Sequence, residues 1–451
     1  MKKGDILEMQ IVESRFPNRG IAYIDDMKIK VEKAFKGQIV RAQIIKKKGA
    51  NIVAMPLEVL KKADYEIEPE CSHFNECGGC SLQRIPYHQQ VMMKGLEVKR
   101  LLDEKGIFVK DFQGVEGSPS PFGYRNKMEY TFGDESKDGK RSLGMHKQGS
   151  FMTIITTDAC KLVHEDYNKL LRIVLDYFNE KEYPFYHKKS HTGLQRNLII
   201  RRSEKTKEIL VNIVTTSQMD FDKEELVKRI LECDLEGSIT GIVHTINDNL
   251  ADSVNCDSLN ILWGNDYYME EILGFKFKVS PFSFFQTNSE ATEKLYSTVL
   301  DYMGGGYYEN VFDLYCGTGT IGQIVSSRAE NVVGIEIIEE AVVAANENVK
   351  INNLDNCQFI AGDVFEKLDE LDKNPDLIVL DPPRAGVSKK ALKKIITYHV
   401  KNIIYVSCNP KTLAENLVDL QEAGYQVERL KVFDNFPQTP HCEVIVRLER
   451  Q

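Results

Sequence analysis

The sequence predicts a multidomain protein in which a small β-rich part and a central α+β part precede a C-terminal α/β part with a parallel sheet. Three observations support this prediction. Short alternating apolar runs fill residues 1–59, strand-like and helical patterns mix over 60–280, and short β-branched runs alternate regularly with helical segments over 281–451. A length of 451 residues suffices for about three domains.

The first part, residues 1–59, is expected to form a small β-barrel. Four runs with alternating apolar and polar side chains, separated by glycine-containing turns, are typical of half-buried strands. One run ends in Lys46, Lys47 and Lys48, and another carries Lys28 and Lys30. Such a basic edge suits nucleic-acid phosphates, and charge is the only local indication of binding.

Charge is distributed unevenly along the chain. The net charge is −9, yet residues 1–50 hold 12 Lys and Arg against 6 Asp and Glu, and residues 181–210 hold 8 against 3. The other 371 residues therefore carry −20. Two basic islands on an acidic body indicate a polyanion bound at particular places, although two solvated basic surfaces would give the same pattern.

Composition excludes several classes of protein. With 30 Gly and 14 Pro, the chain is neither collagen-like nor of low complexity. It contains no apolar run of about 18 residues that could span a bilayer, and no apolar stretch follows its basic N-terminus. We therefore expect a cytoplasmic protein without a membrane partner, and we expect it to be a monomer.

The central part, 60–280, contains an uneven cluster of cysteines. Cys71, Cys77 and Cys80 lie within ten residues, and Cys160 follows downstream. Four thiolates can hold zinc or an iron–sulfur cluster, and spacing alone does not choose between them. A zinc ribbon fits less well because it requires a second paired motif. A helical pattern over about 87–106 could pack on the C-terminal part.

A glycine-rich turn indicates a nucleotide-type ligand in the C-terminal part. The run VFDLYC leads into a turn that starts at Gly317, and a helix follows. Glu336 ends the next strand, where it could bind ribose hydroxyls, and Asp363 ends the third, where it could accept from an adenine amino group. Dinucleotides and S-adenosylmethionine both suit this arrangement.

Two motifs favour S-adenosylmethionine. The stretch DLYCGTGTIG resembles the first motif of class I methyltransferases, and Asp381-Pro382-Pro383-Arg384 resembles their substrate-side motif. The resemblance implies a C-terminal domain of the α/β class I (Rossmann-like) methyltransferase fold over 281–451. Cys408, in Ser407-Cys408-Asn409-Pro410, ends the fifth strand, where a cysteine can be a nucleophile or merely a buried packing residue.

Taken together, these motifs resemble the RNA uracil-5-methyltransferase family, and most of all its 23S ribosomal RNA branch, which carries a TRAM domain. The matching stretches, in their expected order, are Phe284–Asn288, Asp313–Gly319, Asp381–Arg384, Ser407–Pro410 and His441–Val444. Residues 1–59 resemble the TRAM domain. The likeness thus covers nearly the whole chain.

The resemblance implies roles for named residues. Cys408 would attack C6 of uracil, and Glu443 would remove the C5 proton. S-adenosylmethionine would be bound by the glycine loop at Gly317 and by Gln286, Tyr315, Glu336, Asp363 and Asp381. Cys71, Cys77, Cys80 and Cys160 would hold a 4Fe-4S cluster, with zinc less favoured. Cys316 and Cys442 match no catalytic position and are interpreted as packing residues.

The expected partner is 23S ribosomal RNA, and two alternatives remain. One is a transfer RNA uracil-5-methyltransferase, against which we count the N-terminal barrel and the cysteine set. The other is a non-catalytic iron–sulfur RNA-binding protein, against which we count the intact Cys408, Glu443 and glycine loop. The stretch Tyr124-Arg125-Asn126-Lys127 resembles one near the substrate cleft of the family, and it would suit single-stranded RNA.

Overall fold

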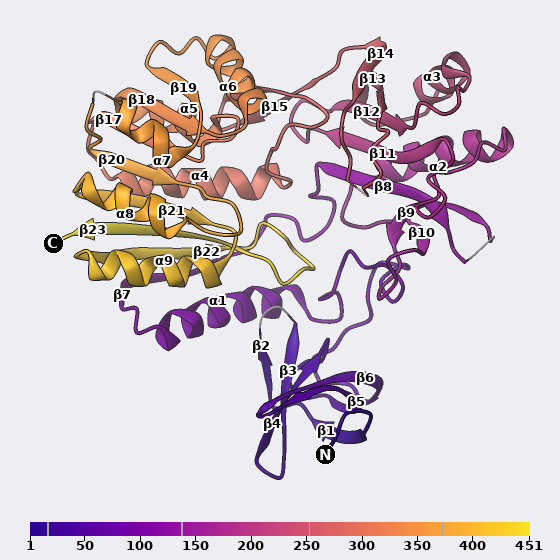
Figure 1. The fold of residues 1–451 in the computed structure, drawn as a ribbon, viewed down its shortest axis with the longest axis horizontal. Helices are drawn as coiled ribbons and strands as arrows, with labels where there is room; N and C mark the ends of the chain where they lie inside the picture. Colours follow the sequence, from indigo (N-terminus) through magenta and orange to yellow (C-terminus); the bar gives the residue numbers. More distant parts are fainter. Residues whose placement is uncertain (16–17, 137–138, 252, 372) are drawn as a thin grey trace.

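The computed structural model describes residues 1–15, 18–136, 139–251, 253–371 and 373–451. Three large sheets form its framework, and the C-terminal and central sheets lie side by side above a smaller N-terminal sheet (Figure 1). Among these residues, no helix is long and apolar enough to cross a membrane.

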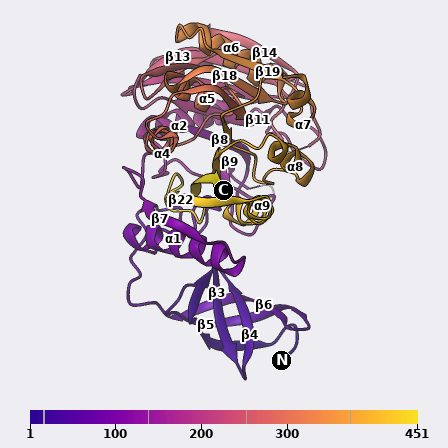
Figure 2. The ribbon, with the colours of Figure 1, turned by 90° about the vertical axis from the view of Figure 1, so that its left-hand side faces the viewer.

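The N-terminal sheet has six strands in the order β1-β5-β6-β4-β3-β2. The strands are β1 (Ile6–Gln10), β2 (Glu13–Arg15), β3 (Arg19–Ile24), β4 (Met27–Glu32), β5 (Ile39–Lys48) and β6 (Asn51–Lys61). Only Ile11 and Val12 separate β1 from β2, which are the two outermost strands, so the chain brings both edges of the sheet together. The apolar side chains of alternate positions fill its interior, and the sheet projects below helix α1 (Tyr87–Glu104) (Figure 2).

The central sheet has seven strands in the order β10-β9-β8-β11-β12-β13-β14. The strands are β8 (Lys127–Asp134), β9 (Arg141–His146), β10 (Ile154–Thr156), β11 (Gln195–Arg202), β12 (Glu208–Thr215), β13 (Ser238–Ile246) and β14 (Ser258–Gly264). Helices α2 (Glu165–Glu180) and α3 (Lys223–Leu231) pack their apolar faces on it. The side chains of His164 and Asp222 cap the two helices.

The C-terminal sheet has eight strands in the order β19-β18-β17-β20-β21-β23-β22-β7. The strands are β7 (Val109–Glu116), β17 (Tyr308–Leu314), β18 (Ala329–Glu336), β19 (Cys357–Ala361), β20 (Leu377–Leu380), β21 (Asn402–Ser407), β22 (Tyr425–Phe433) and β23 (Glu443–Arg450). Strands β17 to β21 are parallel, and β23 is antiparallel to both of its neighbours. A hairpin of β15 (Tyr268–Ile272) and β16 (Phe275–Val279) packs beside this sheet.

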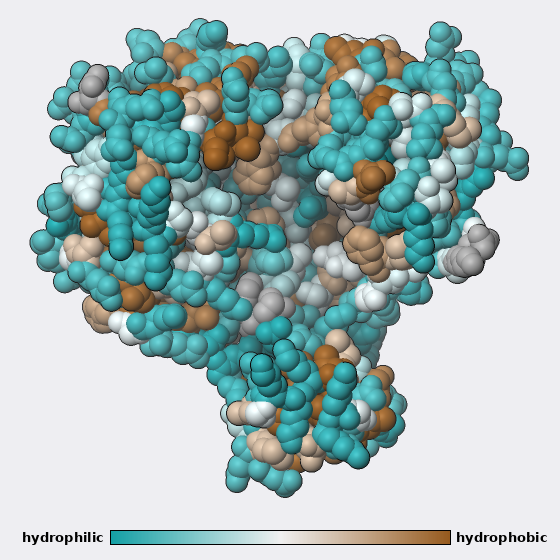
Figure 3. Space-filling view, viewed as in Figure 1, coloured by the Kyte–Doolittle hydropathy of each residue, from teal (hydrophilic) through white to brown (hydrophobic). Residues whose placement is uncertain are grey.

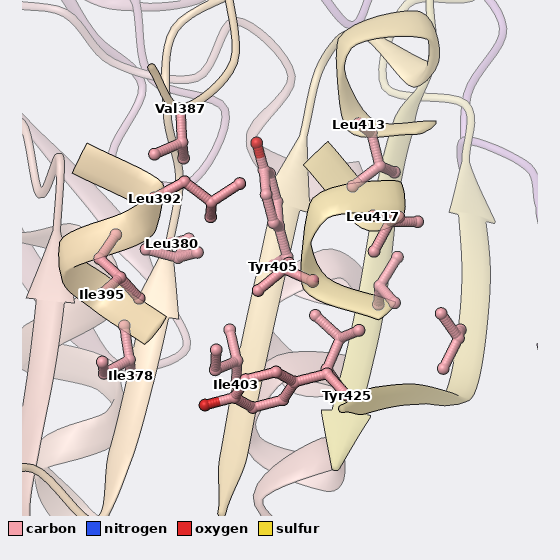
Figure 4. Close-up of a cluster of buried hydrophobic side chains, with 14 of the residues drawn as sticks. Ile378, Leu380, Val387, Leu392, Ile395, Ile403, Tyr405, Leu413, Leu417 and Tyr425 are labelled. Carbon is pink, nitrogen blue, oxygen red and sulfur yellow. The ribbon is translucent and has the colours of Figure 1, made fainter. Parts of the chain in front are cut away.

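Helices cover both faces of the C-terminal sheet. They are α4 (Ser289–Met303), α5 (Thr320–Val325), α6 (Glu339–Ile351), α7 (Val364–Lys367), α8 (Lys389–Thr397) and α9 (Pro410–Glu422), with 3-10 turns at Ser326–Arg328 and Leu368–Glu370. Along β21, Ile403 and Tyr405 face α8 and α9 (Figure 4). Ile404, between them, packs in the other core with residues of α4 and α5. Burial on both faces explains why these strands are continuous apolar runs in the sequence.

The segment 87–116 belongs to the C-terminal body and not to the central sheet. Val98 and Leu102 of α1 lie in the same apolar core as α8 and α9, and β7 pairs in parallel with β22. The helix over about 87–106, for which the sequence allowed packing on the C-terminal part, lies there, whereas β7 and the β15–β16 hairpin are elements of 60–280 that the sequence had placed in the central part. Pairing between strands so far apart along the chain leaves no trace in local residue patterns.

Candidate functional site

The glycine turn after β17 requires unusual backbone conformations. Tyr315, Gly317 and Gly319 all have positive φ, at 66°, 52° and 72°. A Cβ on Gly319 would lie 2.6 Å from the Phe359 ring, so only glycine fits there. The buried Asp313 carboxylate accepts from the Gly322 N–H at 2.8 Å and ties the turn to α5.

Glu336 stands beside this turn at the carboxyl end of β18. One carboxylate oxygen accepts from the Gly317 N–H at 3.1 Å, and the other accepts from the Ile338 N–H at 3.0 Å. These bonds fix the carboxylate while each oxygen keeps a lone pair that could accept from ligand hydroxyls. Asp363 is exposed at the end of β19 and caps α7 by accepting from the Phe365 N–H at 2.8 Å.

Gln286 is held in place by the central part of the chain. The Asn126 side chain donates to the Gln286 carbonyl and to Ser289 Oγ, both at 2.9 Å, and the Asn126 N–H donates to the Thr287 carbonyl at 2.9 Å. Arg201 donates from Nε to the Pro281 carbonyl at 3.1 Å, immediately upstream. Sequence reasoning singled out the stretch containing Asn126 but missed these anchoring contacts, because they join the central and C-terminal bodies.

Cys408 and Asp381 follow neighbouring parallel strands, β21 and β20. The loop that contains Asp381 is tied to the loop that contains Cys408, because Asn409 donates to the Arg384 carbonyl at 2.8 Å. Burial raises the pKa of the Asp381 carboxyl from 3.8 to about 7. Burial, followed by the negative charges of Glu443 and Asp381, raises the pKa of the Cys408 thiol to about 11, and nearby Arg384 opposes this shift.

Glu443 begins β23, directly beside the end of β21. Its side chain is buried, and burial together with the charge of Asp381 raises the pKa of its carboxyl well above the ordinary value. The Cys408 thiol is therefore protonated near neutral pH, and burial shifts the Glu443 carboxyl towards its neutral form. A cation placed between them would favour their charged forms.

A single cavity of about 1590 Å³ joins all these groups. Its lining includes every residue predicted for catalysis or methyl-donor binding: Gln286, Tyr315, Gly317, Glu336, Asp363, Asp381, Cys408 and Glu443. The molecule is visibly hollowed between its C-terminal and central lobes (Figure 3). Arg125, from the stretch that the sequence analysis related to RNA binding, also lines the cavity, as does His441, which was given no individual role.

The four predicted cluster cysteines lie outside this cavity but close to one another. Burial raises the pKa of the Cys80 thiol to about 12, with further contributions from the charges of Cys160, Cys77 and Cys71. Four neighbouring thiols are a suitable donor set for an iron–sulfur cluster. Across the described ranges, however, no three His, Cys, Asp or Glu side chains have the arrangement of a metal site. Cys316 and Cys442 are buried in apolar cores.

Comparison with known proteins identifies the chain's relatives. A family profile described as tRNA (Uracil-5-)-methyltransferase matches residues 260–451. An uncharacterized RNA methyltransferase of Clostridium tetani is 50% identical over 451 residues, covering 100% of this chain and 99% of the relative. The chain belongs to the RNA uracil-5-methyltransferase family. It is an S-adenosylmethionine-dependent enzyme that methylates C5 of uracil in RNA.

Other members resemble the chain over its whole length. An uncharacterized RNA methyltransferase of Clostridium acetobutylicum is 47% identical, and the match covers 100% of this chain and 99% of that relative. The crystal structure of Pyrococcus abyssi tRNA (uracil-54, C5)-methyltransferase in complex with S-adenosyl-L-homocysteine matches the chain with a TM-score of 0.78 and 25% sequence identity. The match covers 98% of this chain and 100% of the Pyrococcus chain.

The solved uracil-5-methyltransferase corrects one step of the sequence argument. We counted the N-terminal part against a transfer RNA enzyme. The Pyrococcus enzyme acts on transfer RNA, and its match leaves only 2% of this chain uncovered, much less than residues 1–59. The N-terminal part therefore does not distinguish the two substrates, because it is common to both proteins.

Proposed function

We propose that the protein methylates C5 of a uridine in 23S ribosomal RNA through a covalent bond between Cys408 Sγ and C6 of the base. The observation that carries this proposal is the pairing of β21 with β23, which brings Cys408 and Glu443 together in the wall that also carries the glycine turn. The uridine must leave its stack to reach these groups.

The proposed reaction balances as follows. The Cys408 thiol loses its proton to solvent, and Sγ adds to C6 while the C5=C6 electron pair forms an enolate. C5 then attacks the methyl carbon, and the donor's S–CH₃ bond breaks with its electrons remaining on sulfur. Glu443 takes the C5 proton, the C5=C6 bond forms again, and the Cys408–C6 bond breaks. The proton on Glu443 returns to the Cys408 thiolate.

The methyl donor would occupy the part of the cavity around the glycine turn. We assign its binding to Gln286, Tyr315, Gly317, Glu336, Asp363 and Asp381. Glu336 is fixed by two backbone donors and suits the ribose hydroxyls, and Asp363 stands at the exposed edge where an adenine amino group could donate. The positive sulfonium would favour the ionised form of Asp381.

A mechanism-based substrate tests the chemistry. The protein is incubated with S-adenosylmethionine and a 23S fragment in which 5-fluorouridine replaces uridine, and peptides are mapped by mass spectrometry. Because fluorine does not leave C5 as a proton does, we expect a methylated adduct on Cys408. An adduct on another residue would refute the assignment of the nucleophile. Failure of every RNA to form one would favour the non-catalytic iron–sulfur RNA-binding alternative.

Transfer RNA is the second candidate substrate, favoured by the whole-chain similarity to the Pyrococcus tRNA enzyme. The 23S assignment rests on the sequence resemblance and the cysteine set. Parallel reactions with unmodified 23S fragments and unmodified transfer RNA, followed by nucleoside analysis, separate the two. Formation of 5-methyluridine in transfer RNA alone would refute the 23S assignment and leave the chemistry intact.

We further propose that residues 1–59 form a TRAM-like barrel that binds the RNA substrate. The adjoining edges of β1 and β2, and exposed Lys46, Lys47 and Lys48 on β5, support this role. Each lysine that contacts a phosphate adds to the salt dependence of binding. Replacing all three lysines with glutamine should therefore weaken RNA binding and reduce its salt dependence, and unchanged binding would refute the assignment.

We also propose that Cys71, Cys77, Cys80 and Cys160 bind a 4Fe-4S cluster, with zinc as the less favoured metal. Burial and, after it, charges within this set raise the pKa of the Cys77, Cys80 and Cys160 thiols, and this proximity supports the proposal. Anaerobic reconstitution followed by iron, sulfide and zinc determination tests it. About four irons per chain are expected for such a cluster, and a fourfold Cys→Ser variant should retain none. Stoichiometric zinc without iron would refute it.

A further inference from the structure

The loop that connects β22 to β23 delivers Glu443 to the cavity. Phe436, Thr439 and His441 on this loop also line the cavity. The opposite side of the loop is buried against three other parts of the chain. Contacts outside the catalytic sheet therefore help to fix the position of the loop and, through it, the position of the Glu443 side chain in the cavity.

Gln438 is the most heavily bonded residue of this loop. Its side chain is 2% exposed, and its φ of +67° lies in a region that non-glycine residues rarely occupy. Its Oε1 accepts from Gln90 Nε2 at 2.9 Å, and its backbone N–H donates to Gln90 Oε1 at 3.1 Å. The two glutamines thus form a reciprocal pair between the loop and α1.

The Gln438 carbonyl is equally constrained. It accepts from the backbone N–H groups of Ser81 and Leu82 at 3.0 and 3.1 Å. Ser81 and Leu82 directly follow the segment that contains Cys71, Cys77 and Cys80. The Gln438 carbonyl therefore links the loop to the end of this cysteine segment. A strained backbone conformation persists only where its surroundings hold it, and here the bonds from Gln90, Ser81 and Leu82 do so.

Two further anchors act on the same loop. Lys94, one turn beyond Gln90 on α1, forms a buried ion pair with Asp434 at 2.5 Å and donates to the Phe436 carbonyl at 3.2 Å. The buried Tyr124 hydroxyl donates to the Pro437 carbonyl at 3.0 Å. Helix α1 and the segment around Tyr124 therefore hold the loop from outside the active site.

We propose that Gln438 is a positioning residue for the reaction: through its pair with Gln90, it sets the direction in which Glu443 meets the C5 proton. This inference rests on the proposed roles of Cys408 and Glu443. Gln438 contacts no reacting atom and acts through the loop. Its loss should therefore slow removal of the C5 proton more than the earlier addition of Cys408 to C6.

The test compares Gln90→Leu with Gln195→Leu. Gln195 is an equally buried glutamine whose side chain donates to the Tyr183 carbonyl in the central body, away from the loop. With RNA carrying tritium at C5, we expect Gln90→Leu to release tritium about 10- to 100-fold more slowly, the scale expected when a catalytic group is misplaced. A covalent protein–RNA complex should accumulate on ordinary RNA, and Gln195→Leu should match the unsubstituted protein.

A second variant keeps the inference testable if Gln90→Leu does not fold. Gln438→Asn shortens the side chain beyond reach of Gln90, while asparagine tolerates positive φ. Tritium release within twofold of normal in the folded variant, or equal slowing of adduct formation and release without accumulation, would overturn the inference. If the unsubstituted protein forms no adduct with 5-fluorouridine RNA, the proposed function fails instead, so the two failures are distinguishable.

Discussion

Cys408 and Glu443 lie at adjacent ends of two antiparallel strands. Ser407 of β21 pairs with Val444 of β23. Because the strands are antiparallel, Cys408, which follows Ser407, adjoins Glu443, which precedes Val444. The effect of the Glu443 charge on the Cys408 pKa reflects this proximity. The strand register therefore brings together a thiol and a carboxyl group that are separated in the sequence by α9 and β22.

Replacing the proposed base should trap the covalent complex. Glu443→Gln retains the size of the side chain but cannot accept the C5 proton, so turnover should fall on the order of 10²- to 10⁴-fold. A denaturing gel should show methylated RNA attached to the protein. Glu449→Gln, at the other end of β23, is the matched control. Normal turnover by Glu443→Gln would show that another group removes the proton.

Binding of S-adenosylmethionine should strengthen as the pH rises through about 7. In the ligand-free protein the Asp381 carboxyl has a pKa of about 7, so it is largely neutral at pH 6 and largely ionised at pH 8. A cationic sulfonium prefers the ionised form. Calorimetry should show about five- to tenfold tighter binding at pH 8 than at pH 6.

Asp381→Asn separates this effect from that of Asp313. Burial also raises the pKa of the Asp313 carboxyl to about 7, and that group contacts the glycine turn. The asparagine variant should bind S-adenosylmethionine weakly and lose most of the pH dependence. If the variant retains the full dependence, Asp313 and not Asp381 is the titrating group.

Gly319→Ala should damage the donor site, whereas Gly305→Ala should not. A methyl group at Gly319 would collide with Phe359 and strain a backbone that has a φ of 72°, but nothing lies within 4 Å of a Cβ at Gly305. The first substitution should cost at least about 1 kcal/mol in unfolding free energy. Urea unfolding and S-adenosylmethionine binding measure both effects, and equal behaviour of the two variants would refute the steric argument.

Phe151→Ala should raise the KM for RNA and leave kcat unchanged. Phe151 is 67% exposed after β9, and Lys188 of the second basic island lies with Nζ 4.6 Å from its ring centroid. The Phe151 ring stacks on His146, whose carbonyl accepts from the Gly78 N–H. The next residue, Gly79, lines the cavity, so Phe151 lies near one end of the cavity wall. Loss of a base–aromatic contact should raise KM about fivefold or more.

The control for Phe151→Ala is Phe108→Ala. Phe108 is 76% exposed between α1 and β7, belongs to neither basic stretch of the sequence, and does not line the cavity. Its removal should leave KM and kcat unaltered. Equal effects of both substitutions would mean that Phe151 makes no specific contact with RNA.

Much of the candidate site could be predicted from sequence because its residues follow successive strands. Tyr315, Asp381 and Cys408 come directly after β17, β20 and β21, Asp363 comes two residues after β19, and Glu336 is the last residue of β18. Carboxyl ends of parallel strands meet at one edge of a sheet, so an alternating strand–helix pattern already predicts that these side chains lie together. In the structure these residues line a single cavity.

The sequence by itself determined the alternating strands of the C-terminal body, the glycine turn and the residues available for chemistry, because periodicity and turn composition are local properties. Only the tertiary structure decided that β7 pairs with β22, that Asn126 holds the segment of Gln286, and that Gln90 holds the loop leading to Glu443. The physical reason is that these contacts join segments far apart along the chain. Burial likewise raised the pKa values of Cys408 and Glu443, and burial depends on the whole fold.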